Sequence, residues 1–354
     1  QGFCVRVLFV GGGTGGHLTP ALGIAEALEA RGHETLFLGT GRSIERGYLG
    51  GRLARSLGLE DRRYGRFGSF VRLCLLPRAM WRVRHPATAF RADLIVGLGG
   101  LASFAFLGAR VPRVLLEGNR VAGKAVKWLE PFAKASYCQY PATLAELSKG
   151  LCVGPIARNA LLAISREEAC KRFRLDPKKP VLLVVGGSQG ALAVNQSVVR
   201  SMPELASQGG QLLALAGPGK AVELREAALQ SRVPACVLEH CDDMGAAWSA
   251  ADLVYCRGGA ATLAEVALFA VPALVSPYPG HKDQQQTRNA EALGHGVQLV
   301  AGMPAQADDD QLVSLLQSES RRSQMRAALK QAIPQDGRET IVSCLESIVS
   351  GATL

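Results

Sequence analysis

The sequence predicts an α/β protein with two similar domains, each a parallel sheet wrapped by helices, that face one cleft. Two turns of small residues, Gly11–His17 (GGGTGGH) and Gly186–Ala191 (GGSQGA), each follow a short apolar run and open onto a helix-like stretch. Strand-like runs alternate with helical patterns along most of the chain. With 354 residues, of which 48% are hydrophobic, the chain is long enough to form two separate cores.

The expected strands fall into two series, and the first strand of each series leads into a Gly-rich turn. The first series is Val5–Val10, Thr35–Leu38, Leu94–Val96, Val114–Leu116, Ser136–Gln139 and Leu151–Val153. The second series is Val181–Val185, Gln211–Ala216, Ala235–Glu239, Leu253–Tyr255, Ala273–Ser276 and Val297–Val300.

The segment Gly154–Ser165 separates the two series and is the expected hinge. We therefore expect residues 1–155 to form an N-terminal domain and residues 156–335 a C-terminal domain. Two or three amphipathic helices are expected in Gln311–Ser350, and residues 336–354 form a last helix able to pack back on the N-terminal domain.

Composition favours a protein of a reducing compartment without a membrane span. No apolar run approaches the roughly 18 residues that cross a bilayer, and the first ten residues pass into a strand without a signal-peptide pattern. The nine cysteines form no CxxC pair, which favours buried free thiols over disulfides or a zinc site.

The Gly-rich turns favour phosphate binding. A turn without Cβ atoms brings backbone N–H groups close to a ligand, and the following helix adds its positive N-terminus. The alternative for either turn is tight packing of helix on strand. Binding of NAD is disfavoured, because Glu34 precedes the second strand and no acid stands at that strand's end.

Positive charge is concentrated in the first part of the chain. Up to residue 165 there are 22 Lys and Arg against 10 Asp and Glu, whereas the remainder has 18 against 20. Residues 62–91 hold eight arginines and no acid, interleaved with large apolar side chains. A membrane-facing patch explains this mixture better than a solvated helix or a nucleic-acid site, for which aliphatic residues are unsuited. The expected patch is Phe67, Phe70, Arg72, Leu73, Leu76, Arg78, Met80, Trp81 and Arg82.

A third turn carries the most specific chemistry. Gly258 and Gly259 follow a strand and lead into a helix that begins with small residues, so the N–H groups of Ala260–Thr262 can bind a diphosphate. Glu265 can accept hydrogen bonds from ribose hydroxyls, although an acid near a helix N-terminus also complements the dipole. Neutral amides suited to sugar hydroxyls follow at Gln285, Gln286 and Asn289.

The motifs together resemble one family. They are GGTGGHxxP, GLGG at Gly97–Gly100, GGSQGA, DDM at Asp242–Met244, CRxGAxTxxE and PxxxHKDxQQxxNA. This combination is similar to the MurG family, the UDP-N-acetylglucosamine:N-acetylmuramyl-(pentapeptide) pyrophosphoryl-undecaprenol N-acetylglucosaminyltransferases. The resemblance implies a GT-B fold of two Rossmann-like domains and inverting transfer of GlcNAc to the MurNAc C4 hydroxyl of lipid I, giving lipid II. It implies no metal and no cofactor.

The resemblance also implies the site residues. Those assigned to the donor UDP-GlcNAc are Thr14, Gly15, Gly16, Asn119, Arg158, Ser188, Gln189, Cys241, Ala260, Ala261, Thr262, Leu263, Ala264, Glu265, Gln285 and Gln286. Those assigned to the acceptor, undecaprenyl-pyrophosphoryl-MurNAc-peptide, are Gly13, Thr14, Gly15, His17, Gly99 and Gly100.

Three departures from the family's pattern affect substrate contacts. The family's HEQN is Leu116–Asn119 here, its GNPxR is Gly154–Arg158, and Leu101 replaces an aromatic residue. Two other functions therefore stay open: another GT-B lipid glycosyltransferase, such as a galactosyldiacylglycerol synthase, and a sugar-nucleotide-binding homologue that has lost catalysis.

His17 is the candidate general base. A neutral imidazole is available near pH 7 because its unperturbed pKa is about 6.5. The alternative is that His17 caps the helix or binds the acceptor's phosphate. Arg158 and the helix that starts near Ala260 would stabilise the departing UDP. Asp308–Asp310 precede an expected helix at Gln311, so N-capping is favoured over a metal site, and His281 is expected to orient its loop.

The expected partners are UDP-GlcNAc, lipid I and an anionic membrane surface, without nucleic acid. The expected location is the cytoplasmic face of the bacterial inner membrane, as a peripheral protein.

Overall fold

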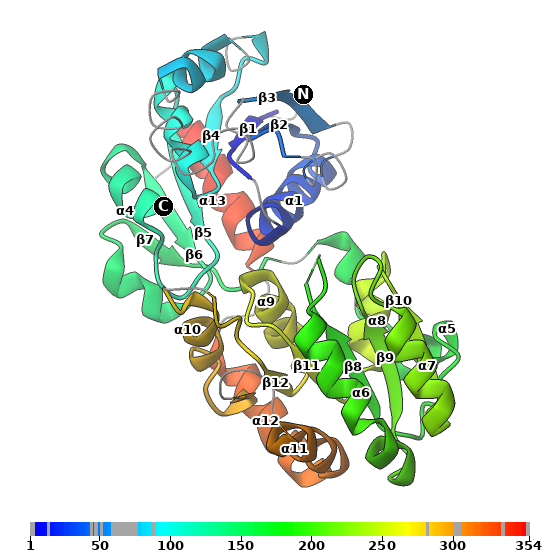
Figure 1. Cartoon of the computed structure of the whole chain (residues 1–354). Coiled ribbons are helices and arrows are strands. Elements are labelled where there is room, and N and C mark those ends of the chain that lie inside the picture. Colours follow the sequence, from blue (N-terminus) through cyan, green and yellow to red (C-terminus); the bar gives the residue numbers. More distant parts are fainter. Residues whose placement is uncertain are drawn as a thin grey trace. The chain divides into compact units, whose positions relative to one another are not determined.

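The computed structural model describes residues 4–12, 15–42, 45, 49, 52–57, 77–85, 89–156, 158–187, 189–280, 283–300, 306–333 and 337–351. The chain divides into two compact units (Figure 1). Residues 1–158 and 334–354 form the N-terminal unit, and residues 159–333 form the C-terminal unit.

The N-terminal unit contains seven parallel strands among its described residues, in the order β3-β2-β1-β4-β5-β6-β7. The strands are β1 (Arg6–Val10), β2 (Glu34–Gly39), β3 (Leu53–Ser56), β4 (Leu94–Gly97), β5 (Arg113–Glu117), β6 (Ala135–Cys138) and β7 (Gly150–Cys152). The helical elements include α1 (Gly15–Ala30), η4 (Leu101–Gly108), α4 (Lys124–Leu129), η5 (Glu130–Phe132), η6 (Pro141–Glu146) and α13 (Arg338–Ser350). Residues 77–85 are helical as well.

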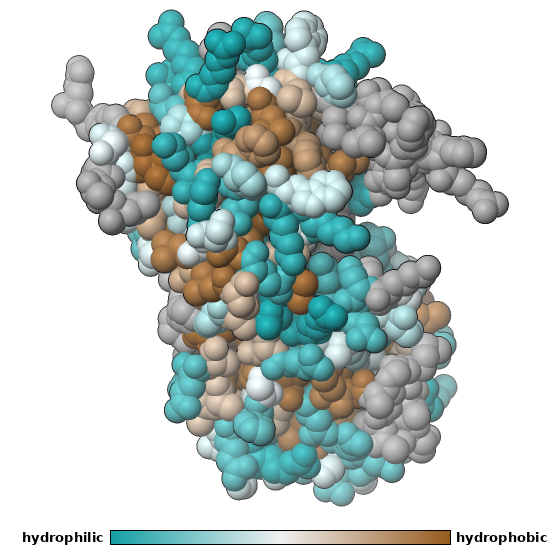
Figure 2. Space-filling model, turned by 90° about the vertical axis from the view of Figure 1, so that its left-hand side faces the viewer, coloured by the Kyte–Doolittle hydropathy of each residue, from teal (hydrophilic) through white to brown (hydrophobic). Residues whose placement is uncertain are grey.

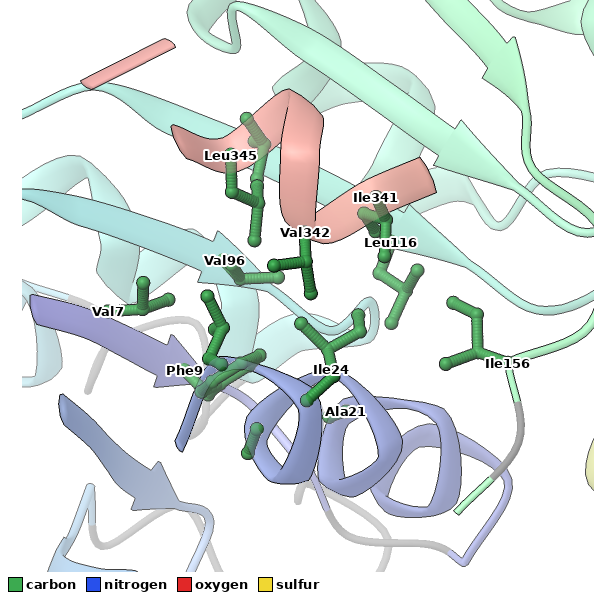
Figure 3. Packing of buried hydrophobic residues seen from close by; sticks show 14 of the residues in the cluster. Val7, Phe9, Ala21, Ile24, Val96, Leu116, Ile156, Ile341, Val342 and Leu345 are labelled. Carbon is green, nitrogen blue, oxygen red and sulfur yellow. The ribbon is translucent and has the colours of Figure 1, made fainter. Parts of the chain in front are cut away.

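The side chains of β1 divide this unit's core into two layers, because successive residues of a strand face opposite sides of the sheet. Val7 and Phe9 pack with α1 and α13, whereas Leu8 and Val10 pack with η4 and α4. Figure 3 shows Val342 and Leu345 of α13 directed into the space that Ile24 and the β1 side chains share. The last helix of the chain is thus part of the N-terminal unit's core.

The C-terminal unit contains six parallel strands among its described residues, in the order β10-β9-β8-β11-β12-β13. The strands are β8 (Val181–Val185), β9 (Gln211–Leu215), β10 (Ala235–Leu238), β11 (Leu253–Cys256), β12 (Ala273–Val275) and β13 (Val297–Leu299). The helical elements are η7 (Asn159–Leu161), α5 (Arg166–Arg172), α6 (Leu192–Ser207), α7 (Val222–Ser231), α8 (Met244–Ala250), α9 (Ala260–Phe269), α10 (Gln285–Glu291), η8 (Gly294–Gly296), α11 (Gln306–Gln317) and α12 (Glu319–Ala332).

Each sheet has a point at which the strand order reverses. The chain leaves β1 toward β2 and later returns to place β4 on the other side of β1. In the same way, β9 and β11 flank β8. Ligands of open parallel sheets bind outside the carboxyl ends of the two strands at such a point. The turns after β1 and β4, and those after β8 and β11, are therefore the places to look for binding residues.

The twelve strands expected from sequence are confirmed, and none of their ends differs by more than one residue. The edge strand β3 was not expected. Helix α11 begins at Gln306, so the expectation that Asp308–Asp310 cap a helix starting at Gln311 is wrong. Asp309 instead lies inside α11 and accepts hydrogen bonds from Ser197 and Arg200 of α6.

Candidate active site

In the N-terminal unit, His17 lies against the turn that follows β4. Its Nδ1 atom is 3.2 Å from the carbonyl oxygen of Gly12. A Cβ atom at Gly99 would be 3.6 Å from His17 Nε2, and one at Gly100 would be 3.8 Å from Cε1. The topology therefore brings together His17, Gly99 and Gly100, which were all assigned to the acceptor, although more than 80 residues separate them in sequence.

The contact with Gly12 determines which nitrogen of His17 can act as a base. A carbonyl oxygen only accepts hydrogen bonds, so this contact requires a proton on Nδ1. In the neutral imidazole, the lone pair is then on Nε2, the nitrogen beside the Gly99 turn. Gly12 itself has φ of 139°, a conformation that L side chains rarely adopt.

Glu117 holds the loop that carries Asn119. Its Oε1 accepts hydrogen bonds from the backbone N and side-chain Nδ2 of Asn119, at 2.8 and 3.0 Å, and its Oε2 accepts one from the backbone N of Gly123 at 2.7 Å. Burial raises the pKa of Glu117, and these hydrogen bonds and the charge of His17 oppose the rise. Sequence reasoning treated Glu117 only as part of an altered motif. The sequence feature that could have identified Glu117 is an acidic residue at the carboxyl end of a buried strand.

Arg158 ends the N-terminal unit and pairs with Glu26 of α1. The distance from Arg158 Nε to Glu26 Oε1 is 3.5 Å. Glu26 is the more buried partner, because 13% of its side chain is exposed against 30% for Arg158. A phosphate bound by Arg158 would have to share the guanidinium with Glu26.

In the C-terminal unit, α9 presents a helix N-terminus after β11. Gly259 is the N-cap residue, and no side chain caps this end. The first backbone bond of the helix runs from Leu263 N to the oxygen of Gly259, so the N–H groups of Ala260, Ala261 and Thr262 have no partner within the helix. Three N–H groups at a positive helix end form an anion site.

Helix α10 packs directly on this turn. A Cβ atom at Gly258 would be 2.3 Å from the backbone oxygen of Gln286, and Asn289 Nδ2 donates to the oxygen of Gly258 at 3.3 Å. The expected phosphate residues and the expected sugar residues Gln285 and Gln286 are thus neighbours. Gln286 Oε1 accepts from the backbone N of Tyr278 at 2.8 Å, so the expected contact with a sugar hydroxyl would use its NH₂ group as donor.

The GGSQGA turn fits the alternative given above, in which its glycines allow a helix to pack tightly on a strand. A Cβ atom at Gly186 would be 2.3 Å from Ala191 N, and one at Gly190 would be 2.1 Å from the oxygen of Ala216. Close packing therefore explains these two glycines without a ligand. Gln189 is exposed beside them at the carboxyl end of β8.

Two comparisons with known proteins cover most of the chain. Residues 7–138 match the Glycosyltransferase family 28 N-terminal domain, and residues 181–340 match the Glycosyltransferase family 28 C-terminal domain. The UDP-N-acetylglucosamine–N-acetylmuramyl-(pentapeptide) pyrophosphoryl-undecaprenol N-acetylglucosamine transferase of Chromohalobacter salexigens is 32% identical over 355 residues, which cover 97% of each chain. The chain belongs to the MurG family.

A second MurG-family relative agrees with this assignment, and a solved structure shares the fold. The transferase of the same name from Verminephrobacter eiseniae is 37% identical over 302 residues, 81% of this chain and 82% of its own. The crystal structure of MurG from Acinetobacter baumannii superposes with a TM-score of 0.75 at 23% identity, covering 97% of this chain and 99% of that one. This likeness confirms the expected fold of two α/β units.

Arg257, in the MurG motif CRxGAxTxxE, was not expected to have a structural role. Its Nη1 donates to the backbone oxygen and the hydroxyl of Ser276, both at 2.9 Å, and to the oxygen of Pro277 at 3.2 Å. Burial lowers the pKa of Arg257 below its usual value. The guanidinium therefore holds the segment that leads from β12 toward α10.

Cys241 lies between β10 and α8 and is partly buried. Burial raises the pKa of its thiol, which disfavours the thiolate. A role through its backbone, as expected for a uracil contact, is compatible with this environment. No group of three or more His, Cys, Asp or Glu that could hold a metal ion occurs among the described residues.

Part of the expected membrane patch lies on the helix at residues 77–85. Ala79 and Val83 are buried in the core, whereas Trp81 is 70% exposed and Arg78 is exposed. Arg82 is partly buried and donates to the oxygen of Leu57 at 3.0 Å, so it also has a structural contact.

Two exposed aromatic side chains elsewhere in the N-terminal unit were not expected. Trp128 of α4 is 68% exposed and Phe132 of η5 is 55% exposed. On the face that Figure 2 shows, apolar surface occurs in separate patches with hydrophilic surface between them. In the described part of the chain, no helix is both long enough and apolar enough to span a bilayer.

Several expected site residues lie outside the described residues. They are Gly13, Thr14, Phe67, Phe70, Arg72, Leu73, Leu76, Ser188 and His281.

Proposed function

We propose that this chain transfers GlcNAc from UDP-GlcNAc to the MurNAc C4 hydroxyl of lipid I, with inversion, and so forms lipid II for peptidoglycan synthesis. The observation that carries the proposal is the level of identity, 31–37%, to transferases named for this reaction, over 97% of the chain in the case of Chromohalobacter salexigens. The position of the two sets of assigned residues, at the switch points of the two sheets, also supports it.

The donor is assigned to the C-terminal unit. The N–H groups of Ala260–Thr262 would bind the diphosphate, Glu265 the ribose, and Gln285 and Gln286 the GlcNAc hydroxyls. The positive end of α9 stabilises the negative charge that grows on UDP as the glycosidic bond breaks. A helix N-terminus supplies this stabilisation without a metal ion.

The acceptor is assigned to the turns around His17. As the C4 hydroxyl attacks the anomeric carbon, its proton must leave, and His17 Nε2 carries the lone pair that can accept it. The C–O bond to UDP breaks as the new C–O bond forms, and the proton ends on the imidazole. The Gly12 carbonyl keeps Nδ1 protonated and stabilises the resulting imidazolium.

Transfer of radiolabelled GlcNAc from UDP-GlcNAc to a lipid I analogue tests the reaction. We expect a labelled lipid product with UDP-GlcNAc as donor, competition by unlabelled UDP-GlcNAc but not by UDP-galactose, and full activity in EDTA. Transfer from UDP-galactose to diacylglycerol would instead identify another lipid glycosyltransferase. Donor binding without transfer to any acceptor would identify a homologue that has lost catalysis.

We also propose that the protein is peripheral on the cytoplasmic face of the inner membrane, since the acceptor carries an undecaprenyl chain. The exposed Trp81 and Arg78 support this placement because an aromatic side chain and a cation both suit the headgroup region of an anionic bilayer.

A further inference from the structure

Trp248 joins α8 to the acidic residue of α9. It is one of the largest fully buried side chains among the described residues, with 1% of its surface exposed. Its Nε1 donates to Glu265 Oε2 at 2.6 Å. Its ring stacks on Phe269, with centroids 6.2 Å apart and an angle of 25° between the planes. The indole therefore contacts two α9 positions that are one turn apart, one through its N–H and one through its face.

Glu265 differs from every other residue of α9. The helix sequence is AATLAEVALF, so Glu265 is its one charged side chain. It is partly exposed, whereas Leu263, Ala264, Val266 and Ala267 around it are buried. A charged group at the border of an apolar helix needs a strong partner if it is to keep one orientation.

The indole is suited to orienting this carboxylate. An indole N–H only donates, so it cannot take a proton from Glu265. A carboxylate has several lone-pair sites, so it can accept from the indole and from a ligand's hydroxyls together. Its ring is fixed by burial and by Phe269, and α8 is itself anchored by Asp243, which caps the helix by accepting from Ala246 N at 3.1 Å. The indole N–H is therefore held in place before any ligand binds.

We propose that Trp248 is a positioning residue for the sugar-nucleotide donor. Its N–H fixes the Glu265 carboxylate in the orientation that accepts hydrogen bonds from the ribose hydroxyls. This inference rests on the proposed function, because it uses the assignment of Glu265 to the ribose. The physical gain is preorganisation: a glutamate that is already held loses less rotamer freedom when the ribose arrives.

Trp248→Phe tests the inference, since phenylalanine keeps an aromatic ring and removes the N–H group. Isothermal titration calorimetry with UDP should show binding weakened by about five- to tenfold, the effect of losing one charge-assisted hydrogen bond. KM for UDP-GlcNAc should rise by a similar factor while kcat changes by less than about twofold. Trp128→Phe, which removes an indole N–H from an exposed site in the other unit, is the matched control and should leave both constants unchanged.

A comparison of UDP with 2′-deoxy-UDP separates positioning from a general loss of structure. The wild-type protein should prefer UDP, and Trp248→Phe should reduce that preference, because only the ribose contact has been weakened. In a Glu265→Ala background, Trp248→Phe should have no further effect on UDP binding. Equal weakening of both nucleotides, or full additivity with Glu265→Ala, would overturn the inference.

A second variant at position 248 and the wild-type result keep failure of this inference distinct from failure of the proposed function. If Trp248→Phe does not fold, benzothienylalanine at position 248 replaces the N–H by sulfur within the same bicyclic shape, and the same loss of preference is expected. Wild-type protein that fails to bind UDP at all would contradict the proposed function. Wild-type protein that binds UDP, with an unchanged preference in both position-248 variants, would contradict only the role of Trp248.

Discussion

His17 Nδ1 lies 3.2 Å from the carbonyl oxygen of Gly12, and this contact leaves Nε2 as the basic nitrogen of the imidazole beside Gly99. The relationship distinguishes a base from a residue with only a capping or binding role, because an asparagine at position 17 could keep the hydrogen bond to Gly12 but could not accept the proton.

His17→Asn should therefore reduce kcat by about 10²- to 10⁴-fold, as expected for loss of a general base, with a smaller change in KM for the acceptor. His17→Ala should be equally impaired. Steady-state kinetics with a lipid I analogue measures both variants. Activity of either variant within about tenfold of wild type would show that His17 is not the base.

Gly258→Ala should weaken donor binding strongly, because the added Cβ would lie 2.3 Å from the Gln286 backbone oxygen and would separate α10 from the phosphate turn. Overpacking of this kind also costs about 1–3 kcal/mol of stability. Gly259→Ala is the matched control, because the nearest atom to its Cβ would be Thr262 Oγ1 at 3.9 Å. UDP titration and thermal unfolding of both variants test the difference, and equal effects would contradict it.

The Arg52–Glu29 ion pair predicts a pH-dependent stability of the N-terminal unit. Arg52 Nε and Nη2 lie 2.9 and 2.6 Å from the two Glu29 oxygens. The hydrogen bond from Arg52 holds the pKa of Glu29 below its ordinary 4.5, and burial opposes it. Because the folded pKa is the lower one, the stabilisation is complete above pH 4.5 and is lost as the pH falls through the folded value.

Arg52→Ala should accordingly destabilise the protein at pH 7 by up to about 1 kcal/mol, since about a third of each side chain is exposed. The difference from wild type should shrink in acid, below the pKa of Glu29. Urea unfolding at several pH values measures it. A difference that is constant from pH 7 to pH 3 would contradict the ion pair's contribution.

Asp309 should be important for stability and not for metal binding. Its side chain is 2% exposed and accepts hydrogen bonds from Arg200 and Ser197, so Asp309→Ala should cost about 1–3 kcal/mol. Asp310→Ala, at an exposed neighbouring position, should cost less than about 0.5 kcal/mol. Chemical denaturation measures both variants. Loss of activity in EDTA, restored by a divalent cation, would contradict this interpretation.

The exposed face of the helix at residues 77–85 should contribute to membrane binding. Trp81→Glu combined with Arg78→Glu should reduce flotation with anionic liposomes by at least about tenfold, since each basic residue contributes about 1 kcal/mol at such a surface. Arg110→Glu, at another exposed position of the N-terminal unit, is the charge control. Unchanged flotation of the double variant would exclude this face as the docking surface.

The sequence predicted the strands well and the irregular elements less well. Each expected strand was an apolar run bounded by turn residues, a pattern that depends only on local composition. Strand β3 has the sequence LARS, which lacks this pattern, and it forms because β2 offers an edge with a register shift between Phe37 and Leu38. The start of α11 was predicted wrongly because its acidic residues resemble an N-cap. Asp309 instead accepts hydrogen bonds from Ser197 and Arg200 of α6.

The candidate site divides in the same way. The Gly-rich turns, the small residues that begin α9 and the amides of α10 are all visible in the sequence, because each depends on residue type and a spacing of a few positions. The contacts of Glu117, Arg257 and Trp248 were missed. The partners of Arg257 and Trp248 are set by how one element packs on another, and those of Glu117 by the path of the loop after β5. Sequence periodicity reports neither.

The sequence by itself determined the alternation of strands and helices, the positions of the turns and the family, because these follow from local pattern and from motif. Only the tertiary structure decided which distant side chains meet. Strand order places the carboxyl ends of β1 and β4 side by side, so His17 reaches the Gly99 turn. Packing of α8 against α9 brings Trp248 to Glu265. Such contacts depend on the relative placement of whole elements, which the burial of their apolar faces fixes.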